Sequence, residues 1–296
     1  MSKAKIAFLI IALVLIIAGG TLFGVCYARG ARYDDNIQFV NKTYDLTEEF
    51  NSIDLELGMS KLEIVKAETN KVEVSETDKF HHEVKVVENK LQIKTIDDTQ
   101  WYEKFLIFGD KYSVKISLNK DVYDSLNVKN GTGSLTISNP FTFTNFTVEN
   151  GTGGVKASNL TITSLKINSG TGSVDLSNIT AGNIDINTST GSKTIQDVHA
   201  TNIKLTGSTA SNRLTNVIAD NELYVKSSTG SIKFDGIDAA TIYMESSTGS
   251  IRGSVLTEKT FIPHSSTGSV RVPTNTTGGT CTLKTSTGSI DVTIKA

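Results

Sequence analysis

Apolar and polar residues alternate through most of the chain after residue 50, which is the two-residue period of half-buried β-strands. In residues 49–125 the runs are irregular and short, as at Ile53/Leu55. Residues 97–105 interrupt them with an aromatic-rich stretch that contains Trp101, the single tryptophan. We expect this stretch to cover an open end of a strand stack, because a solenoid terminus needs a cap. An aromatic ligand-binding loop is the alternative.

From residue 126 to residue 296 the alternation repeats as a fixed unit. Nine copies of a tetrapeptide close to Ser-Thr-Gly-Ser follow one another at spacings of 19 or 20 residues. A fixed period of this length indicates an array of identical structural units. The third residue of the tetrapeptide is glycine in eight copies and alanine in one; in chain order these residues are Gly133, Gly153, Gly172, Gly191, Ala210, Gly230, Gly249, Gly268 and Gly288.

Four further positions of each unit form apolar columns, at seven and five residues before this glycine and at two and four residues after it. The exceptions to the later pair are Lys193, Asn212 and Gly253. Each unit therefore predicts a strand, a tight turn at Thr-Gly-Ser, a second strand and a second corner. The fold predicted is all-β, a parallel β-helix or β-solenoid with coils of 19–20 residues that stack about 4.8 Å apart.

The repeated turn itself is predicted to be structural. We expect the glycines to adopt positive φ at the corner, where a Cβ is unfavourable. Ala210 should then mark a strained or differently turned coil. The threonine and serine beside the glycine can hydrogen-bond along the stack. The column two residues before the threonine, Asn130 to Thr285, is irregular and lies at a corner, which argues against an ice-binding face.

The N-terminus predicts a membrane anchor. Ile6 to Tyr27 are 22 residues without a charge, and as a helix they would be about 33 Å long, enough to cross a bilayer core of about 30 Å. A cleaved signal peptide usually has a shorter apolar core. We predict a cytoplasmic tail (1–5), a transmembrane helix (6–28), a linker (29–48) and an extracytoplasmic remainder, on a Gram-positive-like cell surface.

Charge and residue types exclude several kinds of site. The net charge is −2, and residues 1–32 hold four basic residues and no acid, so the rest of the chain is acidic, which argues against nucleic-acid binding. The two cysteines predict no disulfide framework. The turns lack the aspartates of calcium-binding repeats, and the four histidines are scattered. We therefore predict no metal, no cofactor and no catalytic residues, and a protein that is not an enzyme.

One outward column carries a candidate site. Three residues after the turn residue, four consecutive repeats have Arg213, Lys233, Arg252 and Arg271. We expect these cations to form a stripe with one charge per coil, and like charges so placed repel. The hypothesis is contact with an anionic polymer, such as wall teichoic acid, or with lipid head groups. The alternative is a solvated face neutralised by neighbours such as Asp235 and Glu245.

The pattern resembles a known bacterial family, the "putative adhesin" β-strand-repeat domain. The residues that carry the resemblance are 50–55 (FNSIDL), 112–118 (YSVKISL) and 126–137 (LNVKNGTGSLTI), the last echoed in each repeat. It covers residues 45–296. The resemblance implies a membrane-anchored protein of the cell surface or an accessory of envelope-stress regulation, and it brings no catalytic residues.

The function predicted is a non-enzymatic surface adhesin or binding scaffold whose partners are the membrane and an anionic wall polymer or surface protein. The alternatives are an envelope-stress accessory that signals through membrane partners and, less favoured, a carbohydrate-active β-helix enzyme. The last strand, with Ile290, Val292 and Ile294, is expected to leave an uncovered C-terminal edge open to pairing with another chain.

Overall fold

A computed structural model describes residues 3–28, 38–99, 112–274 and 277–295 of the chain. The N-terminal segment forms one helix, α1 (Lys3–Ala28), over the stretch predicted to be helical. Among the described residues, however, no helix has the length and hydropathy that a membrane span requires. Most of the aromatic stretch, including Trp101, lies outside the described residues.

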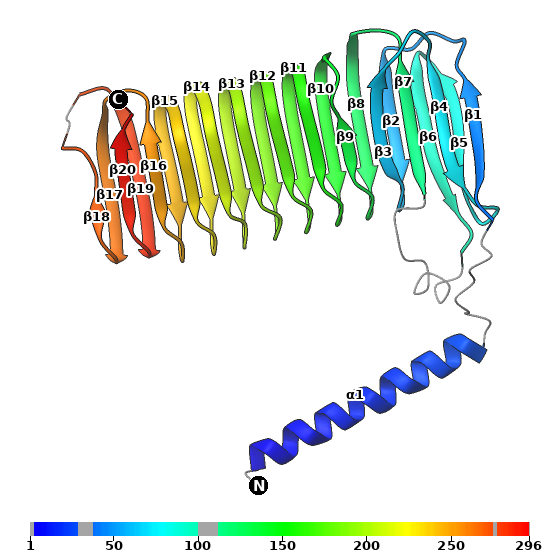
Figure 1. The fold of residues 1–296 in the computed structure, drawn as a ribbon, viewed down its shortest axis with the longest axis horizontal. Helices are drawn as coiled ribbons and strands as arrows, with labels where there is room; N and C mark the ends of the chain where they lie inside the picture. The colour runs from blue at the N-terminus through cyan, green and yellow to red at the C-terminus, as the bar shows by residue number, and fades with distance from the viewer. Residues whose placement is uncertain (1–2, 29–37, 100–111, 275–276, 296) are drawn as a thin grey trace.

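All strands belong to one continuous sheet that winds into a solenoid (Figure 1). They are β1 (Val40–Asp45), β2 (Ser52–Leu57), β3 (Lys61–Lys66), β4 (Lys71–Glu76), β5 (Phe80–Val87), β6 (Lys90–Asp97), β7 (Ser113–Leu118), β8 (Val122–Asn130), β9 (Leu135–Ile137), β10 (Phe141–Asn150), β11 (Val155–Ser169), β12 (Val174–Thr188), β13 (Lys193–Gly207), β14 (Asn212–Ser227), β15 (Ile232–Ser246), β16 (Ile251–Val255), β17 (Lys259–Thr267), β18 (Val270–Arg271), β19 (Gly279–Thr287) and β20 (Ile290–Ile294). The prediction of an all-β solenoid is confirmed.

A coil of the central region is a single long strand between two Thr-Gly-Ser turns. β11 and β12 are both 15 residues long and pair in parallel with a shift of 19 residues. The pairing is interrupted at Asn159 and at Thr163, where two neighbouring residues face outward. Each of these coils therefore has three paired segments and two corners besides the turn, and the prediction of two strands per coil was too simple.

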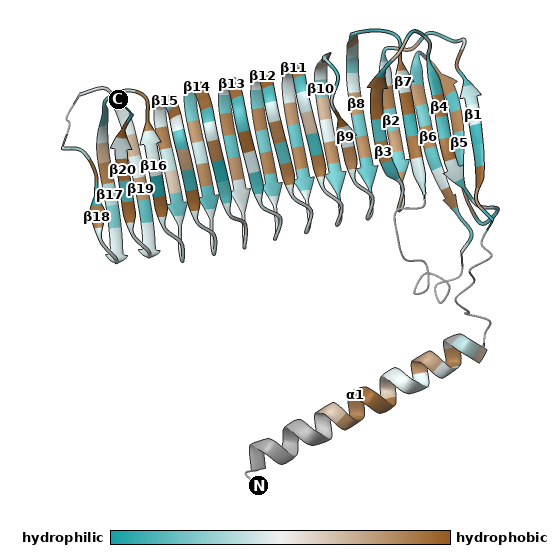
Figure 2. Cartoon of the chain, viewed as in Figure 1, coloured by the Kyte–Doolittle hydropathy of each residue, from teal (hydrophilic) through white to brown (hydrophobic). Residues whose placement is uncertain are grey.

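The predicted apolar columns form one core that runs the length of the solenoid. Val155, Leu165 and Ile167 are at most 1% exposed, and their equivalents in the neighbouring coils are at most 2% exposed. Along each strand, hydrophobic and hydrophilic residues alternate, and like residues line up across strands (Figure 2). At the N-terminal end the core is aromatic, with Tyr123 and Phe143 stacked 6.1 Å apart between ring centroids.

The N-terminal end is closed by antiparallel strands. β2 and β3 form the first regular coil, because they pair in parallel with β8 and β9. β6 and β7 add a further coil on their other edges. β5 then pairs antiparallel with β6, β4 with β7, and β1 with β4. β1 lies inside the stretch predicted to be a linker, so that boundary was wrong.

The C-terminal coils do not stack in chain order. The last coil, β19–β20, pairs with β15 and β16 on one side and with β17 and β18 on the other. In Figure 1 the red final strands accordingly lie inside the outermost pair, β17 and β18. The predicted open edge is therefore covered, and Ile290 and Val292 are at most 1% exposed. The free end of the solenoid is β17–β18.

Close approach explains most of the turn glycines, and positive φ does not. Of the turn glycines only Gly268 has a positive φ, and at 158° it is nearly extended. A Cβ built on Gly172 would instead lie 1.9 Å from the carbonyl oxygen of Gly153 in the preceding coil. The Thr171 N–H in the same turn donates to the Gly151 carbonyl (2.9 Å), so backbone bonds join consecutive turns.

Left-handed backbone occurs at the first corner after the turn, six residues beyond the turn position. Asn159, Asn178, Asp197 and Asn216 there have φ between 51° and 61°, and Gly236 has 64°. Asparagine and aspartate tolerate this conformation better than other residues with a side chain. Their side chains also bond between coils, because the Asn178 amide donates to Asn159 Oδ1 at 2.7 Å.

Candidate functional site

The structure brings three of the four predicted cations together. Arg213, Lys233 and Arg252 are cross-strand neighbours on β14, β15 and β16, and all three are exposed. We call these three residues the basic row. Arg271 does not continue it, because Asp291 of β20 lies between Arg252 and Arg271 in the register. The prediction of four consecutive cations was wrong at its last member, since it assumed that the coils stack in chain order.

Two acids that could have neutralised the basic row are engaged elsewhere. Asp235 accepts hydrogen bonds from Ser254 (2.6 Å) and Lys295 (3.0 Å), and these bonds lower the pKa of its carboxyl. Glu245 likewise accepts from the Tyr243 hydroxyl, and its other oxygen lies 3.1 Å from Lys226 Nζ. Both contacts lower the pKa of Glu245, the tyrosine bond most strongly.

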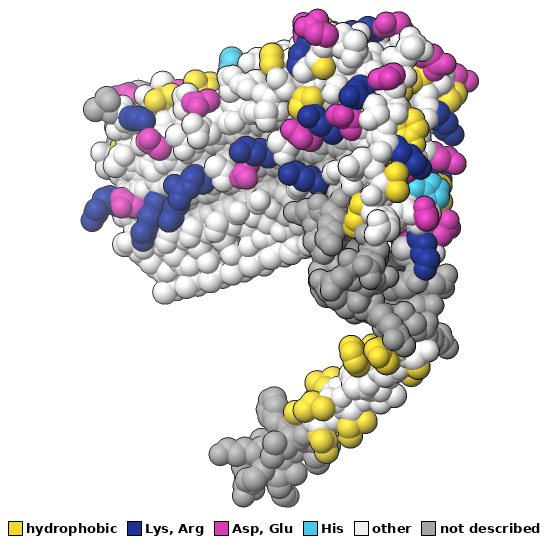
Figure 3. Space-filling view, turned by 45° about the vertical axis from the view of Figure 1, so that its right-hand side comes forward, with side chains coloured by type: hydrophobic (Ala, Val, Ile, Leu, Met, Phe, Trp, Pro, Cys, Tyr) yellow, Lys and Arg dark blue, Asp and Glu magenta, His cyan; other side chains and the backbone are white. Residues whose placement is uncertain are grey.

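Within the described part of the chain, no carboxylate lies within 4.0 Å of a cationic group of the basic row. Parallel strands are about 4.8 Å apart, so three adjacent positive charges lie along the solenoid axis, with Asp291 next to Arg252 in the register at one end. The space-filling view shows Lys and Arg side chains gathered in a line toward the C-terminal end of the solenoid (Figure 3). Such a line attracts a linear polyanion.

A buried chain of polar groups joins the first coil to its cap. Ser60 Oγ lies 2.9 Å from His82 Nε2, and His82 Nδ1 lies 3.2 Å from Glu76 Oε2. Lys42 Nζ of β1 lies 2.5 Å from Glu76 Oε1. Burial raises the pKa of Glu76, but hydrogen bonds from Lys42 and His82 outweigh it, so the net pKa is lowered. Burial lowers the pKa of His82.

The order of these groups is that of a serine hydrolase triad. Ser60 is fully buried, Glu76 is 1% exposed and the imidazole of His82 is 0% exposed. A substrate carbonyl has no path to Ser60 Oγ in this arrangement, so nucleophilic attack is not available to it. These contacts instead connect β1, β4 and β5 to the turn of the first coil. Sequence analysis missed them because the histidines looked scattered along the chain.

A column of buried polar side chains holds the turns, three residues before the turn position. Thr188 Oγ1 donates to the Gly191 carbonyl at 2.7 Å, and Ser246 Oγ donates to the Gly230 carbonyl at 2.8 Å. Both residues are fully buried. This is the column that was weighed as an ice-binding face, and its hydroxyls are not available to a surface ligand.

One coil departs from this scheme, at the alanine turn. Gly207 takes the place of the hydroxyl residue, and a Cβ there would lie 2.8 Å from Lys193 Nζ and 2.9 Å from Ala210 Cβ. Lys193 is 1% exposed, its ammonium donates to Thr188 Oγ1 at 2.8 Å, and burial lowers its pKa to about 8. Lys193 therefore fills the space of the missing side chain. The Thr209 N–H donates to the Ser189 carbonyl at 2.9 Å, as the equivalent N–H does in the glycine turns, so the coil differs in its side chains and not in the backbone bond of the turn.

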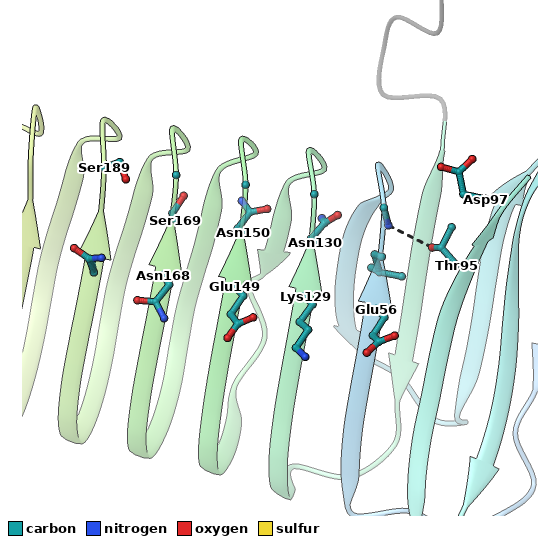
Figure 4. A pocket seen from close by; sticks show the side chains of 16 residues that line it. Glu56, Thr95, Asp97, Lys129, Asn130, Glu149, Asn150, Asn168, Ser169 and Ser189 are labelled. Atoms are coloured by element: carbon teal, nitrogen blue, oxygen red, sulfur yellow. Dashed lines mark hydrogen bonds between the residues drawn. The ribbon is translucent and has the colours of Figure 1, made fainter. Parts of the chain in front are cut away.

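A groove of about 740 Å³ lies on the face before the turns of the N-terminal coils. Its lining comes from the ends of β2, β8, β10, β11 and β12 and from β6. Glu56, Lys129, Glu149 and Asn168 project along one side, and Asp97 lies at the N-terminal end (Figure 4). The described residues hold no group of three or more His, Cys, Asp or Glu side chains that could hold a metal ion.

The fold defines a class, the parallel β-solenoid with a strand-built N-terminal cap. Within that class, the chain belongs to the Toastrack DUF4097 family, whose sequence profile matches residues 50–210. The resemblance to an adhesin-like repeat family is confirmed. No curated protein matches the sequence.

Solved structures of similar fold include proteins from Bacteroides and Parabacteroides species. A protein called a "putative adhesin" from Bacteroides fragilis is 17% identical, with a TM-score of 0.51 over 86% of this chain and 97% of its own. A second "putative adhesin", from Parabacteroides merdae, is 14% identical, with a TM-score of 0.53 over 87% and 97%. A "putative lipid binding protein" from Parabacteroides distasonis is 14% identical, with a TM-score of 0.51 over 87% and 98%. At these identities the likeness concerns the fold alone.

Proposed function

We propose that this protein is a non-enzymatic scaffold of the cell surface that binds an anionic wall polymer through the basic row. The observation that carries the proposal is the pairing of Asp235 with Lys295 and of Glu245 with Lys226, so that no carboxylate of the described residues lies within 4.0 Å of a cationic group of the row. Asp291 is the register neighbour of Arg252 but forms no ion pair with it. Cations that are neutralised by neighbouring carboxylates would attract an anionic ligand weakly. Cations that lie in register without an ion pair favour the binding of a polyanion. The names of the solved relatives agree with a binding scaffold.

The experiment replaces Arg213, Lys233 and Arg252 together by serine in the full chain, kept in detergent because α1 exposes apolar side chains. Retention on purified Gram-positive cell walls and on poly(glycerol phosphate) is measured against salt. We expect at least a tenfold loss, and a salt slope smaller by about 2–3 because about 0.7–0.9 of a counterion is released per phosphate contact.

A matched control removes three exposed lysines that lie before the turns, with K94S, K129S and K166S combined. This control changes the net charge equally and should lose less than about twofold, since isolated surface charges act weakly through screening. Replacing Asp291 by serine should strengthen binding, because it joins Arg271 to the row. Equal, salt-independent retention by the wild type and the basic-row variant would refute the proposal.

The scaffold is further proposed to be anchored in the cell membrane by its N-terminal segment, with residues 29–296 outside. The support is the uncharged run from Ile6 to Tyr27 and the exposure of apolar side chains on α1, where Ile16 is 70% and Phe23 68% exposed. Burying that surface in lipid is favourable. Protease added to intact cells should digest the solenoid, and full protection would contradict this topology.

A further inference from the structure

The antiparallel strands β1, β4 and β5, which we call the cap strands, lie at the N-terminal end of the solenoid (Figure 1). One polar network joins them to the coils: Lys42 lies on β1, Glu76 on β4, His82 on β5, and Ser60 in the turn between β2 and β3. The Ser60 carbonyl also accepts a hydrogen bond from Asn130 Nδ2 of the next coil at 3.1 Å. The network therefore runs from the outermost strand to the turns of the coils.

Hydrogen bonds fix His82 of this network in one neutral form. The ionised Glu76 carboxylate can only accept, so His82 Nδ1, which lies 3.2 Å from Glu76 Oε2, carries a hydrogen. His82 Nε2 lies 2.9 Å from Ser60 Oγ and is then an acceptor, to which the serine hydroxyl donates. The backbone N–H of His82 donates to the same Glu76 oxygen at 2.7 Å. Both ring nitrogens therefore have a partner, although the imidazole is 0% exposed.

A second proton on His82 opposes this arrangement in two ways. Lys42 and Glu76 carry opposite charges, so the added proton leaves an unbalanced positive charge on a buried ring. The proton also turns Nε2 into a donor, and the hydroxyl of Ser60, which is fully buried, loses the atom to which it donates. An imidazole exposed to water takes up the same proton without either cost.

The surroundings of His82 do not balance the added charge. Among the described residues, Glu76 is the single carboxylate within 4.0 Å of the ring. Asp78 is exposed and His81 partly exposed, so water screens their charges. The register partner of His82 on β6 is the uncharged Thr95, and residues 58–60 of the first coil carry no charge.

We propose that this network makes the cap sensitive to acid: when His82 is protonated, the cap strands open locally while the coils stay folded. Most side chains of β1 are exposed, and β4 is its one strand neighbour among the described residues. The described coils hold no equivalent group, because His199 and His264 are exposed and the buried Lys193 and Lys259 stay protonated as the pH falls. Opening frees β1, which follows the N-terminal segment, and it does not depend on the basic row.

Proton linkage gives the expected size of the effect. Burial lowers the pKa of His82 in the closed cap, whereas the open form has an ordinary value of about 6.5. The closed cap is therefore fully stabilised above about pH 6.5 and loses stability as the pH falls below it, by at most about 30-fold in the open population at pH 5. Burial raises the pKa of Glu76, but hydrogen bonds from Lys42 and His82 bring it below its ordinary value, so Glu76 stays ionised in this range.

The test follows amide hydrogen exchange by mass spectrometry in the full chain, kept in detergent, at about pH 7.5 and about pH 5. Protection is expressed relative to the exchange rate of the unfolded chain at each pH. We expect protection in β4 and β5 to fall by about fivefold to 30-fold at the lower pH. Protection in β12 and β13 should change by less than about twofold, because the coils stay folded.

His82→Gln removes the titrating ring, and His81→Gln is the matched control, because His81 is the partly exposed neighbour of His82 on the same strand. H81Q should behave as the wild type does, and protection in the cap of H82Q should change by less than about twofold between the two pH values. The proposal is overturned if cap protection in the wild type does not change, if β12 and β13 lose as much, or if a folded H82Q protein shows the wild-type loss.

NMR of the wild type provides the result if H82Q leaves the cap open at both pH values. The ring signal of His82, identified by its absence in H82Q, should titrate over the same pH range in which β4 and β5 lose protection. Titration of His82 while the cap strands remain protected would also refute the proposal.

Discussion

At the turn glycines, a carbonyl oxygen of the neighbouring coil leaves no room for a side chain. The copies of Ser-Thr-Gly-Ser show that glycine recurs, and the period shows that coils stack. Neither reveals that the glycine in one coil faces a backbone oxygen in the next, so positive φ was the natural but wrong explanation. The asparagine corner was missed for a related reason. Its residues, Asn159 to Asn216, lie between apolar columns and look like ordinary outward polar positions.

Replacing Gly172 by alanine tests the close-approach explanation. The added Cβ would lie 1.9 Å from the Gly153 oxygen and 2.6 Å from its carbonyl carbon, so two coils must move apart. We expect a loss of about 3 kcal/mol or more, at the upper end of overpacking effects, measured by urea denaturation. Gly154→Ala is the control, because its nearest atom is Ser173 Oγ at 3.5 Å and the change should stay within about 0.5 kcal/mol. Similar losses in both variants would disprove the explanation.

Among the elements, β13 and β14 show that a coil can carry polar residues at a core position of the repeat and still stack with its neighbours. Their first residues, Lys193 and Asn212, are paired and at most 1% exposed in an otherwise apolar column. The sequence marks them as exceptions, as it does Ala210. It does not show that they belong together, because the Lys193 ammonium reaches the space at Gly207, fourteen residues away in the chain. By contrast, the buried Lys259 has a counter-ion, with Asp238 Oδ1 at 2.5 Å.

The missing counter-ion at Lys193 predicts a pH dependence of stability. Burial lowers the Lys193 pKa to about 8 in the folded state, against about 10.4 in an unfolded chain. Between these values the unfolded chain binds more protons, so stability rises with pH, by at most about 1.4 kcal/mol per pH unit from this group. Urea denaturation of the wild type at pH 7.5 and pH 10 should show this rise.

Lys193→Met provides the comparison, because methionine fills a similar volume without a charge. It should lack this part of the rise and be at least as stable as the wild type at pH 7.5, since a buried unpaired charge is removed. Thr188 keeps its bond to the Gly191 carbonyl in this variant. Identical pH dependence in the two proteins would show that Lys193 is not the titrating group.

For the whole molecule, the period of 19–20 residues predicted the solenoid but not the order of its last coils. Residues 259–271 and 279–294 carry the same turn and nearly the same columns, so the pattern alone favours stacking in chain order. Pro263 is the sequence signal that could have corrected the predicted order of the last coils.

Pro263 lies in β17, and proline is tolerated on edge strands because it cannot donate a ladder hydrogen bond. The better apolar pair, Cys281 and Leu283, is fully buried inside. The same error affected the prediction of four consecutive cations, because in the observed order of the coils Asp291 separates Arg271 from the basic row.

Engineered disulfides distinguish the two orders. Thr280 of β19 is the register partner of Thr241 in β15 and of Thr260 in β17. In a C26S background, T241C/T280C should therefore oxidise to a disulfide, because neighbouring strands place Cα atoms about 4.8 Å apart, within bonding range. T241C/T260C should stay reduced, since one strand lies between the two positions. The native Cys281 should not interfere, because burial raises its thiol pKa to about 12. Mass spectrometry after mild oxidation reads out both pairs, and a disulfide in T241C/T260C alone would establish stacking in chain order and restore Arg271 to the basic row.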